Sequence, residues 1–322
     1  MEKSETQKIV HPLRPVYDAG SRVLILGTMP SPKSRENGFY YTHPQNRFWR
    51  VLAGILGEDT PADNAEREAL ARRHHIALWD VLASCEIRGA ADGSIQNPVV
   101  NDLGEILKKA PIRRIFTTGR KAAELYARYL QAQTGRISVY LPSTSPANAG
   151  ASLEELEKEY RQILPFLEEV RLLDARPEDG REMAHLFYDA VHMVNCRDYT
   201  PEQLAAWAPE REDAERFSGI LWDSDDALAA RAGETLIGFA NRKGETFDCL
   251  YVQPSWRGTG VAGELAEALE NRARAAGVSA FRVEASITAR GFFARRGYVL
   301  KGEQTVFRRG VALTNYQMEK QL

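Results

Sequence analysis

An apolar run that stops abruptly at a glycine places the strongest limit on how this chain folds. Residues 23–26 are all apolar, and from Gly27 onward the sequence becomes a loop rich in proline and aromatic residues. Such a run predicts a buried strand whose carboxyl end opens into a loop. Open α/β sheets bind their ligands at that end of their strands. We therefore expect a ligand site directly after residue 26.

Three more apolar stretches repeat this pattern in the first half of the chain. The predicted strands cover residues 23–26, 76–78, 115–118 and 138–141, with helical stretches at 48–74, 102–110 and 121–131 between them. A last helix over 152–166 begins with the capping pair Ser152 and Glu155. The alternation predicts an α/β domain with a parallel four-stranded sheet between helices.

A new strand begins near residue 170, so we place a domain boundary there and expect domains 1–168 and 169–322. In the second half, the sequence predicts strands at 170–175, 227–232, 236–241, 247–252 and 281–285, followed by a hairpin. Helices are predicted at 181–191, 260–276 and 289–296. This order is typical of an α+β domain with a mixed, largely antiparallel sheet.

The charge balance gives only weak support to nucleic-acid binding. The net charge is −2, but residues 1–168 hold 22 Lys and Arg against 20 Asp and Glu, whereas residues 169–322 hold 20 against 24. No apolar run approaches the roughly 18 residues of a membrane span, and the opening segment MEKSETQKIV lacks the apolar core of a signal peptide. We expect a cytoplasmic protein without a membrane partner, associated with the nucleoid when it is on DNA.

The cysteines and histidines predict no metal site. Cys85, Cys196 and Cys249 are far apart and odd in number, and they form neither a paired-cysteine motif nor a disulfide framework. His74 and His75 are adjacent, so their side chains diverge. We therefore expect no bound metal.

Two segments resemble the motifs of one enzyme superfamily. Residues 26–49, LGTMPSPKSRENGFYYTHPQNRFW, resemble the first motif of the uracil-DNA glycosylase superfamily, and most closely its hypoxanthine (deoxyinosine) branch. Residues 141–149, LPSTSPANA, resemble the second motif, a loop that presses into the DNA minor groove. The resemblance covers residues 11–168. Some members carry a four-cysteine iron–sulfur cluster, but only Cys85 lies in the matching region, so none is expected here.

The resemblance implies that Asn46 is the catalytic residue of this domain. The turn after the first strand lacks the carboxylate or amide that many members carry there, and in the hypoxanthine branch the Asn of the NRFW cluster takes that role. An Asn is no strong base, so it would orient the attacking water while the protein stabilises a cationic sugar. Alternatively, Asn46 caps the helix that begins at Arg47.

The same resemblance implies the remaining site residues. Phe39 would stack on the extruded base, and the other expected pocket residues are Gly27, Thr28, Tyr40 and Tyr41. DNA contacts are expected from Lys33, Arg35, Ser143, Ser145 and Asn148. No lysine in either motif is placed to form a Schiff base, so we expect a monofunctional glycosylase that needs no cofactor.

The second half resembles the GNAT acyltransferases through the run Arg257-Gly258-Thr259-Gly260-Val261-Ala262. Glycines before a helix let backbone N–H groups approach a pyrophosphate, and the helix dipole favours its negative charge. The later run from Ala289 to Tyr298 resembles the fourth motif of the family. The resemblance implies an acetyl-CoA site that comprises Val252 and residues 257–262.

The catalytic groups of this second domain are harder to assign. Many members carry a Tyr general acid where this chain has Phe293, so the acid would be Tyr251, Tyr316 or solvent. Glu284 and Asp248 are the candidate bases.

Together these features predict a fusion of a DNA glycosylase and an N-acetyltransferase. The glycosylase would act on DNA with a deaminated base, with hypoxanthine favoured over uracil or xanthine, and the acetyl acceptor is unknown. In one alternative, the first half is a non-catalytic DNA-binding module that directs the acetyltransferase to a DNA-associated protein. In another, a small-amine acetyltransferase is joined to an unrelated α/β domain.

Overall fold

Four parallel strands form the centre of the first half of the chain. The computed structural model describes residues 6–88 and 91–322, so half of the opening segment considered above lies outside the described residues. The strands are β2 (Val23–Gly27), β3 (Ile76–Asp80), β6 (Arg114–Thr118) and β7 (Ser138–Leu141), in the order β3-β2-β6-β7. All three neighbouring pairs are parallel. The predicted α/β fold is confirmed.

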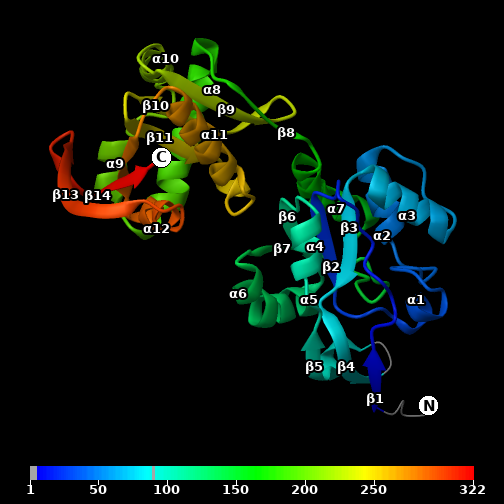
Figure 1. Cartoon of the computed structure of the whole chain (residues 1–322). Helices are drawn as coiled ribbons and strands as arrows, with labels where there is room; N and C mark the ends of the chain where they lie inside the picture. The colour runs from blue at the N-terminus through cyan, green and yellow to red at the C-terminus, as the bar shows by residue number, and fades with distance from the viewer. Residues whose placement is uncertain (1–5, 89–90) are drawn as a thin grey trace. The chain divides into compact units, whose positions relative to one another are not determined.

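Helices cover both faces of this sheet (Figure 1). Leu24 and Leu26 lie in one core cluster with residues of α4 (Gly104–Lys109) and α5 (Arg120–Leu125). On the other face α2 (Phe48–Leu56) packs against α7 (Leu153–Tyr160). The remaining helices of this half are α1 (Pro32–Glu36), α3 (Asn64–Arg73) and α6 (Gln131–Thr134), with a π-helical turn over Tyr126–Leu130 and 3₁₀ turns over Asp92–Ser94 and Arg161–Phe166.

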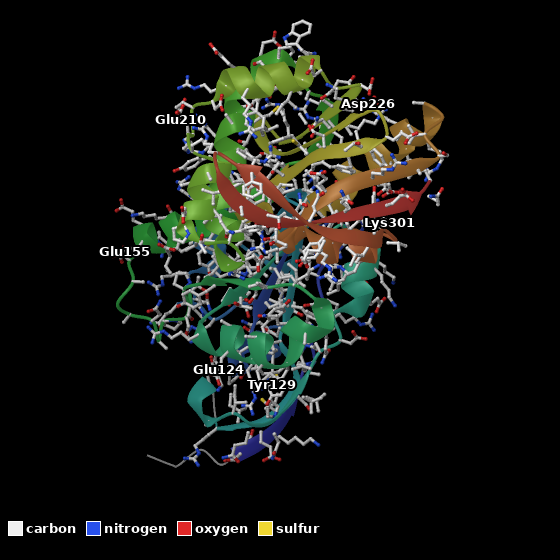
Figure 2. All side chains as sticks on the ribbon, turned by 90° about the vertical axis from the view of Figure 1, so that its left-hand side faces the viewer. Glu124, Tyr129, Glu155, Glu210, Asp226 and Lys301 are labelled. Atoms are coloured by element: carbon white, nitrogen blue, oxygen red, sulfur yellow. The ribbon has the colours of Figure 1, made fainter. Side chains whose placement is uncertain are left out.

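The start of α7 shows how the sequence sets a helix boundary. The Ser152 hydroxyl accepts a hydrogen bond from the Glu155 backbone N–H at 3.1 Å, and the Glu155 carboxylate accepts one from the Ser152 N–H at 2.7 Å. Figure 2 shows Glu155 at the surface, where this exchange takes place. The predicted capping box is confirmed.

A second, smaller sheet was not predicted. Strands β1 (Thr6–Val10), β4 (Leu82–Arg88) and β5 (Gln96–Val100) form an antiparallel sheet in the order β1-β4-β5. The outer strands are mostly exposed, so they contain no buried apolar run that would reveal them. Their strand geometry comes from pairing with β4, which is a long-range effect.

The second half contains one seven-stranded sheet, in the order β13-β14-β12-β11-β10-β9-β8. Its strands are β8 (Val170–Asp174), β9 (Asp226–Ala232), β10 (Thr235–Lys243), β11 (Thr246–Val252), β12 (Ala280–Ser286), β13 (Val299–Arg308) and β14 (Val311–Gln321). Only β11 and β12 pair in parallel. The predicted mixed, largely antiparallel sheet is confirmed, and the two compact units of the chain are Met1–Glu168 and Glu169–Leu322.

Two groups of helices pack on this second sheet. The helices are α8 (Gly180–Val194), α9 (Pro201–Trp207), α10 (Ala214–Trp222), α11 (Val261–Ala275) and α12 (Ile287–Arg295), with 3₁₀ turns over Pro177–Asp179, Asn195–Arg197 and Pro254–Trp256. Phe187 of α8 and Phe217 of α10 share a core cluster with Phe239 of β10. The backbone of Gly238 faces α11 instead, where an added Cβ would lie 3.0 Å from Leu265.

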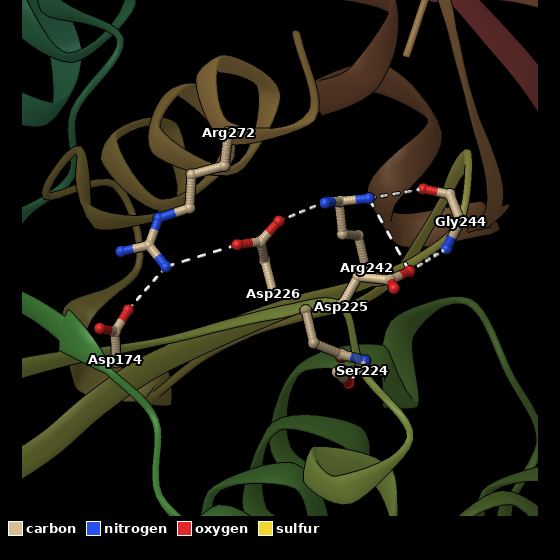
Figure 3. A network of polar contacts seen from close by, with 8 residues as sticks. Asp174, Ser224, Asp225, Asp226, Arg242, Gly244 and Arg272 are labelled. Carbon is tan, nitrogen blue, oxygen red and sulfur yellow. Dashed lines mark hydrogen bonds and ion pairs between the residues drawn. The ribbon is translucent and has the colours of Figure 1, made fainter. Parts of the chain in front are cut away.

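Ion pairs tie α11 to the edge of this sheet (Figure 3). Asp226 of β9 accepts a hydrogen bond from Arg242 of β10 at 2.5 Å and lies 3.6 Å from Arg272 of α11. Arg272 in turn donates to Asp174 of β8 at 2.6 Å. A second cluster surrounds Glu270 of α11, which pairs with Arg296 at 3.0 Å and with Lys320 at 2.7 Å. These contacts hold α11 against the sheet.

The described residues include no helix with the length and apolar character needed to cross a membrane.

Candidate active sites

Asn46 joins the two polar loops of the first unit. Its side-chain oxygen accepts hydrogen bonds from the Phe48 backbone N–H at 2.9 Å and from the Thr144 hydroxyl at 2.8 Å. The first bond reaches the first residue of α2, whose N-cap is Arg47 without a side-chain capping bond, so Asn46 supports the helix start from the residue before the cap and also bonds to the second loop. Both lone pairs of the oxygen are therefore engaged. Within the described part of the chain, its Nδ2 group makes no hydrogen bond and remains available as a donor.

Arg47 holds the second loop by its main chain. The guanidinium donates to the carbonyl oxygens of Asn148 at 2.8 Å, of Ser145 at 3.3 Å and of Ala151. The Arg47 backbone N–H also donates to the Thr144 carbonyl at 3.1 Å. No role was expected for Arg47, although it lies inside the NRFW cluster. These contacts place the two predicted loops side by side.

The predicted DNA-contacting side chains of the second loop also shape the loop itself. The Ser143 hydroxyl accepts from the Ser145 N–H, and the Ser145 hydroxyl accepts from the Ala147 N–H, each at 3.3 Å. A hydroxyl that accepts keeps its own proton, which it can donate to a phosphate. Asn148 differs, because its Nδ2 donates to the Ser143 carbonyl at 2.8 Å.

The two predicted basic contacts lie on the short helix α1. Lys33 is exposed and pairs with Glu36 at 2.9 Å, while Arg35 is half-buried. An exposed pair of this kind contributes little to stability, so Lys33 can exchange Glu36 for a phosphate at small cost.

Phe39 and Tyr40 lie largely inside the first unit. Phe39 is 8% exposed and stacks on Trp49 with ring centroids 6.0 Å apart. Tyr40 is 2% exposed and its hydroxyl donates to the Arg14 carbonyl at 2.9 Å. Both rings support the loop from within in this structure, and Tyr41 is the more accessible of the three neighbouring aromatic residues.

Tyr41 directs its ring toward the carboxyl ends of the strands. Its backbone has a φ of +56°, which a Tyr rarely adopts. The ring stacks on Phe48 at 3.9 Å, and the hydroxyl lies 3.3 Å from the Thr118 hydroxyl at the end of β6. Burial and the negative charge of Asp80 raise the pKa of Tyr41, so the phenol keeps its proton.

Asp80, which the sequence analysis did not select, ends β3 directly beside Gly27. The two residues pair in register, and a Cβ on Gly27 would collide with Asp80 Oδ1. The Asp80 side chain is 4% exposed, and its Oδ2 lies 2.8 Å from His11 Nε2. Beside it, the Thr28 hydroxyl donates to Asp92 at 3.4 Å. Asp80 follows the apolar run of β3 just as Gly27 follows that of β2. Its position directly after an apolar run was the signal in the sequence that could have singled it out.

The glycine-rich turn of the second unit has the geometry of an anion site. Gly258 and Gly260 have φ values of +73° and +98°, which favour glycine, and α11 begins at the next residue. Thr259 is buried, and its hydroxyl donates to the Trp256 carbonyl at 2.7 Å, so it closes the turn. The first N–H groups of a helix lack partners within the helix. With Arg257, Val261 and Ala262, this turn makes up the segment that the sequence predicts to bind the pyrophosphate of acetyl-CoA.

Strands β11 and β12 separate next to that turn. Their pairing covers only Thr246 with Arg282 and Phe247 with Val283. Val252, at the end of β11, pairs with Gly238 of β10. The separation leaves the carboxyl half of β11 without a parallel neighbour. This half of the strand lies close in sequence to the glycine-rich turn.

The two candidate bases have different surroundings. Glu284 follows the last β11–β12 pair and is exposed, and the only hydrogen bond of its side chain among the described residues is a long one of 3.5 Å from Asn315. Asp248 accepts a 2.9 Å hydrogen bond from Asn241, and the Cys249 thiol lies 3.6 Å away. The Glu284 carboxylate is therefore less restrained by hydrogen bonds than that of Asp248.

The aromatic residues near this site also differ. Phe293 is 2% exposed and packs against Phe247 and Tyr298. Burial, together with a nearby Cys249, raises the pKa of Tyr251, which packs on Phe187 at 4.9 Å. Tyr316 lies under the Arg290 guanidinium at 4.4 Å.

No group of three or more His, Cys, Asp or Glu side chains within residues 6–88 and 91–322 is arranged to hold a metal ion. In the same ranges, Cys85, Cys196 and Cys249 are all free.

Comparison with known proteins identifies both units. Residues 14–169 match the uracil DNA glycosylase superfamily and residues 195–320 match the acetyltransferase (GNAT) domain, and the chain belongs to both families. Over 137 residues it is 36% identical to a hypoxanthine DNA glycosylase of Methanosarcina barkeri, covering 42% of this chain and 85% of that protein. Over 149 residues it is 32% identical to an uncharacterized N-acetyltransferase of Escherichia coli, covering 46% and 94%.

A solved structure is also similar to the second unit. The crystal structure of a GCN5-related N-acetyltransferase from Rhodopseudomonas palustris shows 37% identity and a TM-score of 0.46, covering 47% of this chain and 95% of that one.

Proposed function

We propose that the first unit hydrolyses the N-glycosidic bond of a deaminated base in DNA, with hypoxanthine preferred over uracil and xanthine. The observation that carries this proposal is the joining of both polar loops by Asn46 and Arg47 at one edge of the sheet. The relative from Methanosarcina barkeri, named a hypoxanthine DNA glycosylase, supports the choice of base.

The geometry gives Asn46 a specific part in this reaction. Because its oxygen accepts two hydrogen bonds, it meets the attacking water through the Nδ2 donor. The water then keeps a lone pair for C1′ while the C1′–N bond breaks, the base leaves with the bonding electron pair and the sugar becomes cationic. When the water adds to C1′, its released proton neutralises the departed base through solvent. Such a dissociative path needs a well-placed water more than a strong base. The Ser143 and Ser145 hydroxyls would hold the flanking phosphates.

A cleavage assay tests this proposal. The full chain is incubated with end-labelled duplexes that contain one hypoxanthine, uracil or xanthine, and abasic sites are then cut with hot alkali. We expect strand cleavage of the hypoxanthine duplex only after alkali. Asn46→Ala should lower the rate by about 100-fold or more, the usual cost of removing one preorganised polar contact. Absence of cleavage in every duplex would contradict the glycosylase assignment.

We propose that the second unit transfers an acetyl group from acetyl-CoA to an amine. Residues 257–262 fit the pyrophosphate through the glycine turn and the start of α11, with Val252 beside them. Acetyl-CoA, when bound, supplies the acetyl group as a thioester. Glu284 would take the proton from the acceptor amine, because it is the less restrained of the two carboxylates.

Calorimetric titration with acetyl-CoA tests this second assignment without knowledge of the acceptor. We expect one site per chain, and Glu284→Gln should leave cofactor affinity unchanged while lowering turnover with any amine that serves as acceptor. Loss of cofactor binding in that variant would contradict the separation of roles.

A further inference from the structure

One face of the second sheet carries aromatic side chains that are only partly buried, next to the place where β11 separates from β12. Tyr251 of β11 pairs in register with Phe239 of β10, and their ring centroids lie 5.5 Å apart. Phe187 of α8 lies 4.9 Å from Tyr251, and Trp207 of α9 packs against the same core. Tyr251 and Trp207 keep part of their surface exposed, so they offer an apolar wall to a ligand.

Two arginines lie beside this wall. The Arg216 guanidinium of α10 lies over the Phe187 ring at 4.9 Å. Arg308 ends β13, and Val306, two residues earlier on the same face of that strand, packs against the core cluster that also contacts Tyr251. Within residues 6–88 and 91–322 neither arginine forms an ion pair with an acid, and both are exposed. Their charges are therefore available to an anionic group of a ligand.

The thiol of Cys249 marks the place where charges of both signs converge. Cys249 lies two residues before Tyr251, on the same face of β11. Burial and the charge of Asp248 raise the pKa of this thiol, while the charges of Arg216 and Arg308 oppose that rise, so both cations are close to it. The Asp248 carboxylate lies 3.6 Å from the sulfur. One acid and two cations thus surround a single short side chain.

Glu284 points to the same side of the sheet. Its neighbour Val283 is buried and pairs with Phe247, which packs against Phe293 on the side that α11 and α12 cover. Because successive residues of a strand point to opposite faces, Glu284 points to the α8 side. The base proposed above and the two arginines therefore lie on one face of the sheet.

This arrangement of charges complements that of an amino acid, which carries an amine and a carboxylate on one carbon. We propose that the acetyl acceptor is a free amino acid with an apolar or aromatic side chain. Its carboxylate binds Arg216 and Arg308, and its side chain packs on Tyr251. Its amine faces the acidic side chains, with Glu284 as the base. The inference rests on the proposed acetyltransferase function and deepens it by naming the class of acceptor.

Arginine suits the recognition of a carboxylate because its planar fork donates two parallel hydrogen bonds. The rings of Phe187 and Phe217, at 4.9 and 5.5 Å, hold the Arg216 guanidinium in place before a ligand arrives. Less conformational entropy is then lost on binding. An amine without a carboxylate gives up these charge-assisted hydrogen bonds, which are stronger than neutral ones.

The transfer balances with the groups already named. The amine nitrogen forms a bond to the acetyl carbon, and the carbon–sulfur bond of the thioester breaks with its electron pair on sulfur. The proton released by the nitrogen passes to Glu284 and from there through solvent to the thiolate.

Matched pairs of amines test this inference in binding and in turnover. The full chain, saturated with CoA, is titrated in a calorimeter with leucine, phenylalanine and tryptophan. The comparison ligands are isopentylamine, phenethylamine and tryptamine, which lack only the carboxylate. Acetyl-CoA then replaces CoA, and mass spectrometry quantifies the acetylated products. The variants are Arg216→Gln and Arg308→Gln, and Arg274→Gln, exposed on α11, is the matched control.

We expect at least one of the three amino acids to bind about 10-fold or more tightly than its matched amine, the usual effect of hydrogen bonds between charged groups. Arg216→Gln should remove most of this preference. Arg308→Gln should reduce it by about threefold or more, since one of the two cations is lost. Arg274→Gln should match the wild type.

The outcomes separate this inference from the proposed function. Equal binding within all three pairs, or a preference that is unchanged in both arginine variants, overturns the inference even if acetyl-CoA binds as expected. A preference unchanged in one variant overturns the role of that arginine. If the amino acids bind with the expected preference but no product forms, the acetyl-transfer assignment fails and the amino acid site stands.

Affinity for CoA shows whether a variant is folded. Arg216 packs on two phenylalanine rings, so its replacement is the more disruptive of the two. If Arg216→Gln loses affinity for CoA, Arg308→Gln decides, and an unchanged preference in that variant overturns the inference.

Discussion

The Thr144 hydroxyl donates a 2.8 Å hydrogen bond to the side-chain oxygen of Asn46, across 98 residues of sequence. Thr144 is 2% exposed, so its hydroxyl is held in place by the packing around it. The bond fixes the orientation of the carboxamide, since the oxygen accepts hydrogen bonds from Thr144 and Phe48 while the NH₂ group makes none among the described residues. In the proposed function, the second loop therefore orients Asn46 in addition to contacting DNA.

We predict that Thr144→Val lowers the rate of base excision by about threefold to tenfold, because it removes one neutral hydrogen bond and frees the Asn46 carboxamide to rotate. Single-turnover kinetics on the hypoxanthine duplex measure this effect. Thr144→Ser keeps the hydroxyl and is the control. Equal rates for the Val and Ser variants would show that Thr144 does not orient Asn46.

Arg47→Lys should weaken both DNA binding and excision by about tenfold or more. A lysine carries a compact point charge and lacks the planar fork of a guanidinium. It therefore cannot donate to several carbonyl groups at once. The carbonyls of Ser145 and Asn148 would lose their donor and the loop its position. Arg50→Lys, an exposed neighbour on α2, is the control and should behave as the wild type. Titration of both variants with labelled duplex distinguishes the two residues.

In the second unit, Gly260→Ala should reduce acetyl-CoA affinity and cost about 1–3 kcal/mol of unfolding free energy, because a side chain is strained at a φ of +98°. Gly219→Ala lies in an exposed turn of α10 with no atom within 4 Å of the added Cβ. That control should be neutral or stabilising by about 0.5–1 kcal/mol. Calorimetry and urea unfolding provide the two readouts, and identical behaviour of the two variants would contradict the prediction.

The acid stability of the second unit should depend on Glu270. Burial alone would raise the pKa of this carboxyl, but hydrogen bonds from Arg296 and Lys320 outweigh it and lower the pKa. The stabilisation is therefore present above the ordinary Glu pKa of about 4.3 and is lost as the pH falls through the lowered value. Glu270→Gln should cost about 2 kcal/mol or more at pH 7, because it removes one partner of a buried ionic cluster.

Urea unfolding of the full chain at several pH values between 7 and 3 measures this dependence. The difference in unfolding free energy between the wild type and Glu270→Gln should shrink as the pH falls below about 5. Glu267→Gln, an exposed position on the same helix, should follow the wild type throughout. A difference that stays constant with pH would rule out the ionic origin of the stabilisation.

β2, β3 and β6 could be predicted from the sequence because each is a short, mostly apolar run that is buried in the structure, whereas in β7 only Leu141 is buried. The run that ends at Gly27 is buried along its full length. β1 and β5 have no such run, and they become strands only through pairing with β4. In general, an element that owes its form to a distant partner leaves little trace in its own residues.

The candidate sites divide in the same way. Asn46 and the glycine turn are marked by residue type and spacing, so the sequence alone singles them out. Asp80 becomes significant only because β2 and β3 pair in a register that places it opposite Gly27, and because His11 approaches it from 69 residues away. The contacts of Arg47 depend on the shape of a loop about 100 residues later, which no local pattern encodes.

Among the described residues, the Arg47 side chain bonds to the second loop and the residues after it only through carbonyl oxygens, at residues 145, 148 and 151. Every amino acid has a backbone carbonyl group, so these hydrogen bonds do not depend on which side chains those positions carry. Substitutions there can alter what the loop touches while its path past the sheet is preserved. If the loop contacts DNA as proposed, single substitutions at these positions can change those contacts while the path of the loop is preserved.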